Sequence, residues 1–401
     1  MKKIISLILT VFIMLGLCAC GEPKGDSGST APLATSDTAM AAARTYSDGQ
    51  ATPLTLDNTY YKLTREKKLN VAYVGGSVTV GTGSSSTECW RAYTQEWFKQ
   101  AFPQAEITET YAAIGATGTA LAITRLEEDI IQHSPDLVFI EFSVNDKYKS
   151  RTYAQSAILL EGMIHKINRE LPNTDIVVIT VVDKDSIKNG SENARAHRDV
   201  ALYNGITYMD MTEPLETAMQ STGKDWDYYI NDYVHPNKRG YRVLSDYITE
   251  KLDKMLKDSA TREVALKPIV LPEKTFASNP ITQHKVIVAT DLTYDEEMWK
   301  AGRPMRSPAA LGNDKLETIR AQKGATLKLT FQGAVIMLVG DFQAGSRVRC
   351  QIDGGHMKMI GGSDDSGAVI LYDNLDPNLQ HTLAITVEGG GLCGIGKVFI
   401  G

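Results

Sequence analysis

The sequence predicts an α/β domain built on a parallel sheet, followed by a smaller all-β domain. Two observations carry this prediction. Between residue 60 and about residue 258, short apolar runs alternate with longer segments of helical periodicity, the order typical of a parallel sheet with helices on both faces. Beyond about residue 280, strand-like runs separated by glycine-containing turns follow one another with almost no helical signal, which is typical of a β-sandwich or jelly roll.

Residues 1–20 are predicted to be the signal peptide of a bacterial lipoprotein. A lysine pair and a short apolar stretch lead to Leu17-Cys18-Ala19-Cys20, and this stretch is too short to favour a membrane span. The tetrapeptide resembles the lipobox, whose last cysteine is lipidated and becomes the mature N-terminus. The resemblance implies that Cys20 anchors the chain to the extracytoplasmic face of the bacterial cell membrane. The alternative is an ordinary secretory signal cut near Ala19.

Residues 21–58 are rich in Gly, Ser, Thr, Ala and Asp without apolar periodicity, so we expect a flexible tether. Beyond it we predict an α/β domain over 59–262, a proline-containing linker over 263–280 and a β-domain over 281–401. The formal net charge of −6 becomes −8 when the two leader lysines, Lys2 and Lys3, are removed. This charge argues against a nucleic-acid partner and against docking on anionic lipid through a basic patch.

Three cysteines remain beyond Cys20: Cys89, Cys350 and Cys393. Cys350 and Cys393 lie in the same C-terminal region and could pair outside the cytoplasm, which would leave Cys89 as a packing residue. The sequence contains no cluster of His, Cys and acidic residues with convincing metal-ligand spacing, and no glycine-rich phosphate loop followed by lysine. We therefore expect no metal and no cofactor.

The predicted strands of the α/β domain are five apolar runs: 70–75, 107–112, 136–142, 175–182 and 206–210. Helical periodicity is found in five segments: 88–102, 119–133, 153–171, 192–203 and 237–257. In parallel sheets of this kind, ligands bind outside the carboxyl ends of the strands. The residues that follow each strand are therefore the candidates for a functional site.

The first strand ends in Gly75-Gly76-Ser77, a glycine-backed turn. A serine in this place has an exposed hydroxyl and a free backbone N–H, the two features that nucleophilic catalysis of acyl transfer needs. The alternative is a tight turn in which Ser77 only caps the next helix. Gly115 follows the second strand, Asn145 follows the third, and His235 precedes the last helix, so all four residues are expected at one rim.

This constellation resembles the SGNH hydrolases, also called the GDSL esterase family, over residues 70–258. The family's first, third and fifth blocks appear here as Gly75-Gly76-Ser77, Ser143-Val144-Asn145-Asp146 and Asp232-Tyr233-Val234-His235, and its second-block glycine as Gly115. Two positions depart from the pattern, since the family has aspartate in place of Gly76 and glycine in place of Ser143. Neither position supplies a catalytic group in the family. The resemblance implies a flavodoxin-like three-layer fold and hydrolysis of esters through a serine.

The chemistry of these residues assigns their expected roles. Ser77 becomes a nucleophile when a base takes its proton, and His235 is the candidate base because imidazole titrates near neutral pH. Asp232 can accept a hydrogen bond from the other ring nitrogen and fix the tautomer. The oxyanion donors would be the backbone N–H groups of Ser77 and Gly115 and the side-chain amide of Asn145.

Other residues near these motifs have structural explanations. Asp146 is expected to cap loop N–H groups, Glu141 to be satisfied structurally at a strand end, and His197 to be a surface or packing residue. Four aromatic residues before the histidine could stack on a sugar ring or pack the loop: Trp226, Tyr228, Tyr229 and Tyr233. The β-domain could bind carbohydrate or serve as a structural module.

We therefore predict a lipid-anchored, extracytoplasmic serine esterase that removes acyl groups, with O-acetyl as the expected group, from a carbohydrate or cell-wall glycan. Another small ester is the broader substrate class. Two alternatives stay open: an O-acyltransferase that uses the same residues, and a non-catalytic glycan-binding lipoprotein. The presence of Ser77, Asn145, Asp232 and His235 together weakens the second alternative.

Overall fold

The computed structural model describes residues 55–305, 311–312, 316–362 and 367–401. These residues belong to one compact unit. The predicted signal peptide with its lipidation site, Cys20, and the predicted tether as far as residue 54 lie outside the described residues. The limits given above for the domains and the linker remain predictions.

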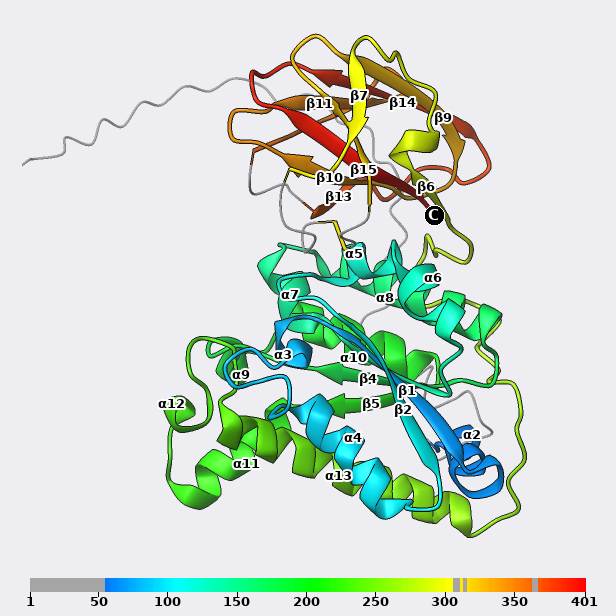
Figure 1. Ribbon diagram of the computed structural model, residues 1–401, viewed down its shortest axis with the longest axis vertical. Coiled ribbons are helices and arrows are strands. Elements are labelled where there is room, and N and C mark those ends of the chain that lie inside the picture. Colours follow the sequence, from blue (N-terminus) through cyan, green and yellow to red (C-terminus); the bar gives the residue numbers. More distant parts are fainter. Residues whose placement is uncertain (1–54, 306–310, 313–315, 363–366) are drawn as a thin grey trace, which may run out of the picture. The chain divides into compact units, whose positions relative to one another are not determined.

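The first sheet has five parallel strands in the order β2-β1-β3-β4-β5 (Figure 1). The strands are β1 (Lys68–Gly75), β2 (Glu106–Ala113), β3 (Leu137–Glu141), β4 (Asp175–Thr180) and β5 (Thr207–Asp210). This is the flavodoxin-like order, in which ligands bind where the order of strands reverses, here between β1 and β3. The predicted fold class and all five predicted strands are confirmed.

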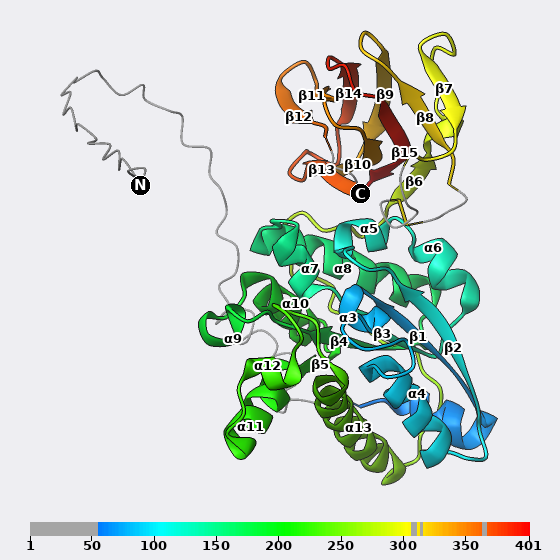
Figure 2. The same cartoon turned by 60° about the vertical axis from the view of Figure 1, so that its left-hand side comes forward.

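Alternation along the strands separates the two faces of this sheet. Val71 and Tyr73 of β1 pack with helices α4 (Trp90–Ala101), α11 (Thr212–Thr222) and α13 (Lys238–Ala260). The intervening Ala72 and Val74 pack with α8 (Tyr153–Glu170) and α10 (Glu192–Tyr203) on the opposite face. Figures 1 and 2 show these two groups of helices on either side of the sheet. The result is a three-layer α/β/α arrangement with a buried apolar core on each face.

The prediction of one continuous helix over 119–133 is wrong. The segment forms three short helices instead: α5 (Thr119–Ile123), α6 (Leu126–Asp129) and η2 (Ile131–His133). The first break comes after α5, where the Thr124 hydroxyl donates a hydrogen bond to the carbonyl of Leu121 at 2.8 Å. At the next residue, the buried Arg125 side chain turns inward and donates to the carbonyl of Ala112 at 2.8 Å. Side-chain bonds to the backbone compete with helix continuation at such positions.

The remaining helices of the α/β part are short and were not predicted as separate elements. They are α2 (Asp57–Tyr61), η1 (Lys62–Glu66), α3 (Ser77–Val80), α7 (Ser143–Tyr148), α9 (Ser186–Asn189) and α12 (Trp226–Tyr229). The longer helix α11 was also missed, because its apolar residues are sparse and only two of its side chains, Pro214 and Leu215, are buried. None of the helices in the described residues combines the length and apolar character that crossing a bilayer requires.

The C-terminal part is a sandwich of antiparallel strands. One sheet contains β6 (Lys285–Val288), β7 (Trp299–Gly302), β8 (Thr318–Ala321), β10 (Ile336–Phe342), β13 (Gly367–Tyr372) and β15 (Cys393–Ile400), with a 3-10 turn, η3 (Ala289–Asp291), after β6. The other sheet contains β9 (Thr326–Gln332), β11 (Val348–Ile352), β12 (His356–Ile360) and β14 (Gln380–Val387). Strand-like runs in the sequence, at 285–289, 326–331, 335–339, 347–352, 368–372, 381–387 and 394–400, predict seven of these strands. The sequence pattern missed β7, β8 and β12, which are only four or five residues long.

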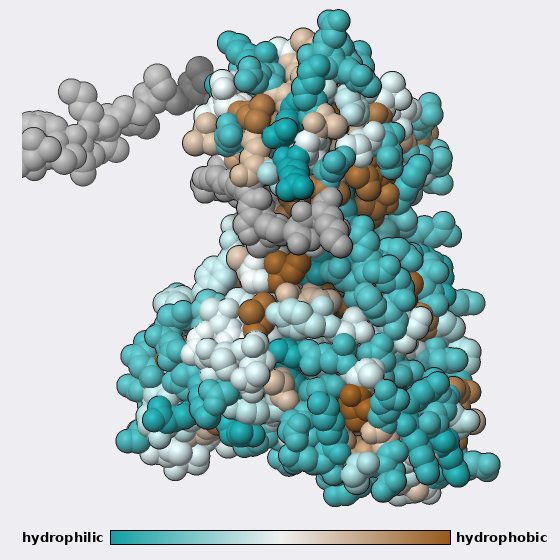
Figure 3. All heavy atoms as spheres, viewed as in Figure 1, coloured by the Kyte–Doolittle hydropathy of each residue, from teal (hydrophilic) through white to brown (hydrophobic). Residues whose placement is uncertain are grey.

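The three cysteines of the described residues are all free and buried. The disulfide suggested between Cys350 and Cys393 is therefore not formed in this structure, although both thiols face the sandwich core. Cys89 packs in the α/β core beside α4, as expected. On the face shown in Figure 3, hydrophilic residues predominate and apolar ones are scattered.

Candidate active site

Ser77 lies at the point where β1 ends and α3 begins. Gly76 is the residue before the helix, and no side chain caps α3, so the alternative in which Ser77 merely caps a helix is wrong. The Ser77 hydroxyl instead lies 2.9 Å from Nε2 of His235. The two residues are 158 positions apart in the chain, and the fold brings them to hydrogen-bond distance.

Asp232 completes a chain of three polar side chains. Its Oδ2 lies 2.7 Å from Nδ1 of His235. Because an ionised carboxylate can only accept, Nδ1 carries the ring proton and Nε2 is left as acceptor for the Ser77 hydroxyl. Partial burial works to raise the pKa of Asp232, but the backbone N–H groups of His235 and Val234 and the His235 ring outweigh it and hold the pKa below its usual value. The carboxylate therefore stays ionised at neutral pH.

The loop that carries Asp232 and His235 is closed on itself. Asp232 Oδ1 accepts from the backbone N–H groups of Val234 and His235 at 2.8 Å each. The N–H of Asn231 donates to the His235 carbonyl at 2.9 Å, and the indole N–H of Trp226 donates to the Asp232 carbonyl at 3.0 Å. The mutual position of the carboxylate and the imidazole is thus fixed locally.

The expected oxyanion donors surround the same serine. Asn145 is almost fully buried, and a side chain at position 76 would place its Cβ 2.1 Å from Asn145 Oδ1. Gly76 stands where the family that this chain resembles has aspartate, and in this structure the missing side chain leaves room for the Asn145 amide beside the turn. A Cβ at Gly115 would meet only the Ser77 Cβ, at 3.9 Å, so no protein atom fills that space. Within the described part of the chain, neither the Ser77 nor the Gly115 N–H has a hydrogen-bond acceptor.

Glu141 supports the serine turn from behind. This carboxylate is fully buried at the end of β3 and accepts from the Thr79 hydroxyl at 2.8 Å and from the Gly76 N–H at 3.3 Å. Burial raises the pKa of Glu141 to about 7, against the lowering effect of these hydrogen bonds, and the nearby Asp146 adds to the rise. The expectation that Glu141 is satisfied structurally holds for one of its oxygens, while Oε1 has no hydrogen-bond partner among the described residues.

Asp146 has a structural position, as the sequence suggested. Its carboxylate accepts from the N–H and the hydroxyl of Thr119 at 2.9 and 2.7 Å, which caps α5. His197 is fully buried and places Nε2 3.1 Å from the same carboxylate. Ser143 stands where the family that this chain resembles has glycine. Its hydroxyl donates to the Val181 carbonyl and accepts from the Val181 N–H. These bonds fix α7, and with it Asn145, against α5, α10 and the end of β4.

The aromatic residues before His235 divide into two pairs. Trp226 and Tyr229 are buried and pack the loop, whereas Tyr228 and Tyr233 are exposed. One exposed aromatic residue near the site, Tyr148, escaped the sequence argument. The available signal was its spacing, three residues after Asn145 on the helix that the third motif begins.

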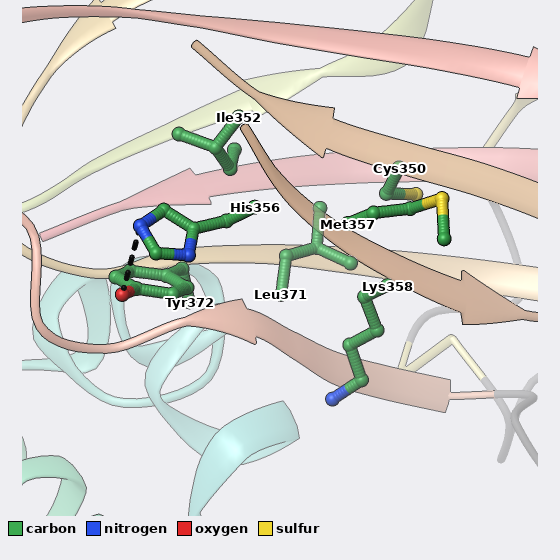
Figure 4. Close-up of a pocket in the computed structure, with 7 residues that line it drawn as sticks. All are labelled: Cys350, Ile352, His356, Met357, Lys358, Leu371 and Tyr372. Carbon is green, nitrogen blue, oxygen red and sulfur yellow. Dashed lines mark hydrogen bonds between the residues drawn. The ribbon is translucent and has the colours of Figure 1, made fainter. Parts of the chain in front are cut away.

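The described residues contain no group of three or more His, Cys, Asp or Glu side chains that could hold a metal ion. A separate cavity of about 250 Å³ lies in the β-sandwich (Figure 4), and its lining residues are Cys350, Ile352, His356, Met357, Lys358, Leu371 and Tyr372. Figure 4 shows the rings of His356 and Tyr372 packed together, with centroids 4.7 Å apart.

The position of this cavity has a structural explanation. His356 and Lys358 lie on edge strand β12 opposite the buried Ile352 and Cys350 of β11, so their side chains project from the same face of the sheet while remaining exposed at its edge. A lysine on an edge strand opposes pairing with the strands of other molecules.

Comparison with known proteins places this site in a family. Residues 73–243 match the model of the GDSL-like Lipase/Acylhydrolase family. The comparison with curated proteins gives no match. Among solved structures, the chain is similar to a two-domain esterase (CEX) active on acetylated mannans, with a TM-score of 0.68 and 22% identity over 86% of this chain and 95% of that chain. The same esterase co-crystallized with mannopentaose gives a TM-score of 0.65 and 20% identity over 83% of this chain and 90% of that chain.

The fold and the site define an α/β ester hydrolase with a serine at the end of the first strand and an appended β-sandwich. Residues 73–243 of the α/β part match the model of the GDSL-like lipase/acylhydrolase family, and this match together with the site identifies the chain as a serine ester hydrolase. The structural similarity extends over both parts of the chain, so the two-domain architecture is shared with the esterase named above.

Proposed function

We propose that this protein is an esterase that removes acyl groups, chiefly O-acetyl groups, from a carbohydrate outside the cell through Ser77, His235 and Asp232. The observation that carries the proposal is the continuous contact from Ser77 Oγ to His235 Nε2 and from His235 Nδ1 to Asp232 Oδ2, at 2.9 and 2.7 Å. A nucleophile, a base and a group that orients the base are thereby in place.

In the first half of the reaction, Ser77 Oγ attacks the carbonyl carbon of the ester while its proton passes to His235 Nε2. Asp232 stabilises the imidazolium that forms. The oxygen of the tetrahedral intermediate is placed near the N–H groups of Ser77 and Gly115 and near the Asn145 amide, and losing one such donor costs about 10²–10³ in rate. Collapse of the intermediate breaks the bond to the alcohol oxygen, which takes the proton from His235 and leaves as a sugar hydroxyl.

In the second half, water attacks the acyl-serine, and His235 again takes the proton and returns it to Ser77. The products are a carboxylic acid, acetic acid in the proposed case, and the free enzyme. The side chains of His235 and Asp232 are 22% and 53% exposed. The base is therefore open to solvent, so water can act as the second nucleophile.

Two observations support a glycan as the substrate. The protein to which this chain is similar over both parts is an esterase active on acetylated mannans. The triad also lies in an open position, with exposed tyrosines beside it, which suits a polymer better than a buried acyl chain. We therefore propose an acetylated, uncharged glycan such as an acetylated mannan as the substrate class.

The test is the release of p-nitrophenol from acetyl and longer acyl esters and of acetate from acetylated mannan. We expect activity on short esters that falls by at least about 10³-fold in Ser77→Ala and in His235→Ala. Tyr228→Ala, which changes an exposed residue of the same segment, is the matched control and keeps its activity. Full activity in Ser77→Ala would overturn the proposed mechanism.

An added acceptor sugar separates hydrolysis from acyl transfer. If the acyl group appears on the acceptor and acetate release falls in proportion, the protein is a transferase, and the hydrolytic proposal is wrong. Unchanged acetate release in the presence of the acceptor is the result that we expect.

We also propose that Cys20 carries the lipid anchor at the extracytoplasmic face of the membrane. The support is the sequence alone, Leu17-Cys18-Ala19-Cys20 after an apolar stretch. Cys20→Ala should abolish incorporation of labelled fatty acid, whereas Cys18→Ala should retain it. Labelling of the Cys20→Ala variant would refute the anchor at this residue.

A further inference from the structure

Four tyrosines of the α/β part are exposed over more than a third of their surface: Tyr111 (50%), Tyr148 (51%), Tyr228 (38%) and Tyr233 (43%). Two of them already have a cation over the ring. The guanidinium of Arg91 lies 4.8 Å from the ring centroid of Tyr111, and that of Arg239 lies 4.6 Å from the centroid of Tyr228. These rings are engaged within the protein and are not free to bind a ligand on the covered face.

The other two tyrosines flank the triad. Tyr148 is the last residue of α7, the helix that carries Asn145, and Tyr233 stands between Asp232 and His235. In the described residues, neither Tyr148 nor Tyr233 has a cation or another aromatic ring against its face. Both rings therefore present apolar surface to solvent beside the reacting groups.

Two carboxylates of the loop after β4, those of Asp183 and Asp185, raise the pKa of the two phenol groups. Partial burial and the Asp183 carboxylate raise the pKa of Tyr148 above its usual value. The Asp185 carboxylate raises the pKa of Tyr233 to about 12. Each phenol therefore remains protonated at neutral pH.

The loop after β4 joins the two elements that carry the rings. The almost fully buried Asp183 accepts from Lys147 Nζ with both oxygens, at 2.8 and 2.7 Å, which ties the loop to α7. The N–H of Lys184 donates to the carbonyl of Tyr233 at 3.0 Å, which ties it to the loop of the triad.

We propose that Tyr148 and Tyr233 form an aromatic platform that binds the sugar residue whose hydroxyl carries the acyl group. The inference rests on the proposed function, because it assigns a binding role toward a glycan ester. The C–H face of a pyranose packs on an aromatic ring, and a tyrosine side chain has few torsions to immobilise on binding. The two lysines of this rim, Lys147 and Lys184, are paired with Asp183 and Asp227, so they do not attract an acidic sugar and the platform fits a neutral glycan.

The experiment compares two substrates in single variants. Tyr148→Ala and Tyr233→Ala are assayed with p-nitrophenyl acetate and with acetylated manno-oligosaccharides. We expect kcat/KM for the oligosaccharide to fall at least about tenfold, mostly through KM, while kcat/KM for p-nitrophenyl acetate stays within about twofold. Tyr148→Phe and Tyr233→Phe keep the ring and should retain most of the oligosaccharide activity. Tyr228→Ala, with its ring face covered by Arg239, is the matched control and should leave both substrates unaffected.

The outcomes separate the platform from the proposed function. Loss of activity on both substrates to the same extent in the alanine variants would overturn the platform, as would full activity on the oligosaccharide. If the unaltered protein releases p-nitrophenol but no acetate from acetylated manno-oligosaccharides or other neutral glycans, the glycan substrate is wrong, and the platform falls with it. If the unaltered protein hydrolyses no ester at all, the proposed function fails first.

Discussion

At the scale of single residues, Glu141 is a carboxyl group whose buried surroundings disfavour its ionised form. It is fully buried, and burial raises its pKa to about 7 from an ordinary value of 4.5. The carboxylate nevertheless accepts from Thr79 and Gly76 and so holds the turn that presents Ser77. The site thus tolerates an unfavourable ionisation in order to fix the position of Ser77, the proposed nucleophile.

This raised pKa predicts how stability depends on pH. Between pH 4.5 and 7 the unfolded chain has lost the Glu141 proton while the folded chain retains it, so the free energy of unfolding decreases as pH rises through this window. The loss that Glu141 contributes is complete above pH 7 and amounts to about 3 kcal/mol. Glu141→Gln does not titrate, so the difference in unfolding free energy between variant and parent should shift in favour of the variant by about that amount from pH 4.5 to pH 8.

Urea unfolding at the two pH values measures this shift. Asp175 is also buried and has a pKa raised to about 7, and the Glu141→Gln variant retains it. The double difference is the change, between the two pH values, in the difference in unfolding free energy between variant and parent. It cancels the contribution of Asp175 and isolates that of Glu141. A double difference of zero would mean that Glu141 ionises normally in the folded protein.

At this scale the sequence pattern named the residues that meet at the candidate site, but not the residues that pack beside them or hydrogen-bond to their neighbours. Ser77, Asn145, Asp232 and His235 could be named because each follows a strand or precedes a helix in a motif with fixed spacing. The ring of Tyr148 could not be assigned, because its exposure depends on how α7 packs against the loop after β4. The buried partner of Asp146, His197, lies 51 residues away, and no local pattern links the two.

At the scale of elements, the loop of Gly83 is coupled to the loop of His235. Gly83 has a φ of +94°, and a Cβ there would lie 2.5 Å from the carbonyl oxygen of Pro236 and 3.0 Å from the Cβ of His235. Asn231 also donates its side-chain amide to the Gly83 carbonyl. The segment after α3 is therefore one wall against which the triad loop is positioned.

Gly83→Ala should displace His235 relative to Ser77. A shift of about 1 Å in a reacting group can cost about 10²-fold in rate, so we expect kcat for p-nitrophenyl acetate to fall 10- to 100-fold. Gly223→Ala is the matched control, because Gly223 has a φ of +66° but no atom within 4 Å of the added Cβ. The control should lose about 1 kcal/mol of stability and keep its activity. Equal activity in the two variants would argue against this coupling.

The elements themselves were predictable where they are long and periodic. The strands of the parallel sheet and the helices α8, α10 and α13 follow apolar patterns that burial on one face or both explains. The break in 119–133 was not predictable, because it depends on Arg125 reaching the carbonyl of Ala112 on a neighbouring strand. The short strand β12 was missed because four of its five residues are exposed, so it carries no alternation.

At the scale of the whole molecule, the two parts of the chain share a core. Ile123 and Ile158 of the α/β part belong to one buried apolar cluster with Met337 and Phe399 of the sandwich. The ammonium group of Lys397, whose side chain is 1% exposed, leaves β15 to bond the Thr124 carbonyl at 3.1 Å and the Glu128 carboxylate at 3.2 Å. An appended β-module was predictable from the sequence, but this shared core was not, because it pairs residues more than 170 positions apart.

A shared core predicts that the two parts unfold together. Leu338 is buried within the sandwich, in a cluster confined to that part, whereas its neighbour Met337 faces the shared cluster. Each change to alanine should cost about 2–5 kcal/mol. If unfolding is all-or-none, Leu338→Ala lowers the hydrogen-exchange protection of β3 amides in the α/β part as much as that of β10 amides, although its side chain touches only the sandwich.

Amide hydrogen exchange resolved by strand makes the measurement. Met337→Ala is the companion variant, since its side chain lies in the shared cluster and should affect β3 whether or not the sandwich can open alone. If Leu338→Ala weakens protection in β10 and leaves β3 unchanged, the sandwich opens by itself and the shared core does not couple the two parts. Equal loss in both strands would mean that the sandwich contributes its stability to the sheet that positions Ser77, which gives the β-module a structural role in catalysis.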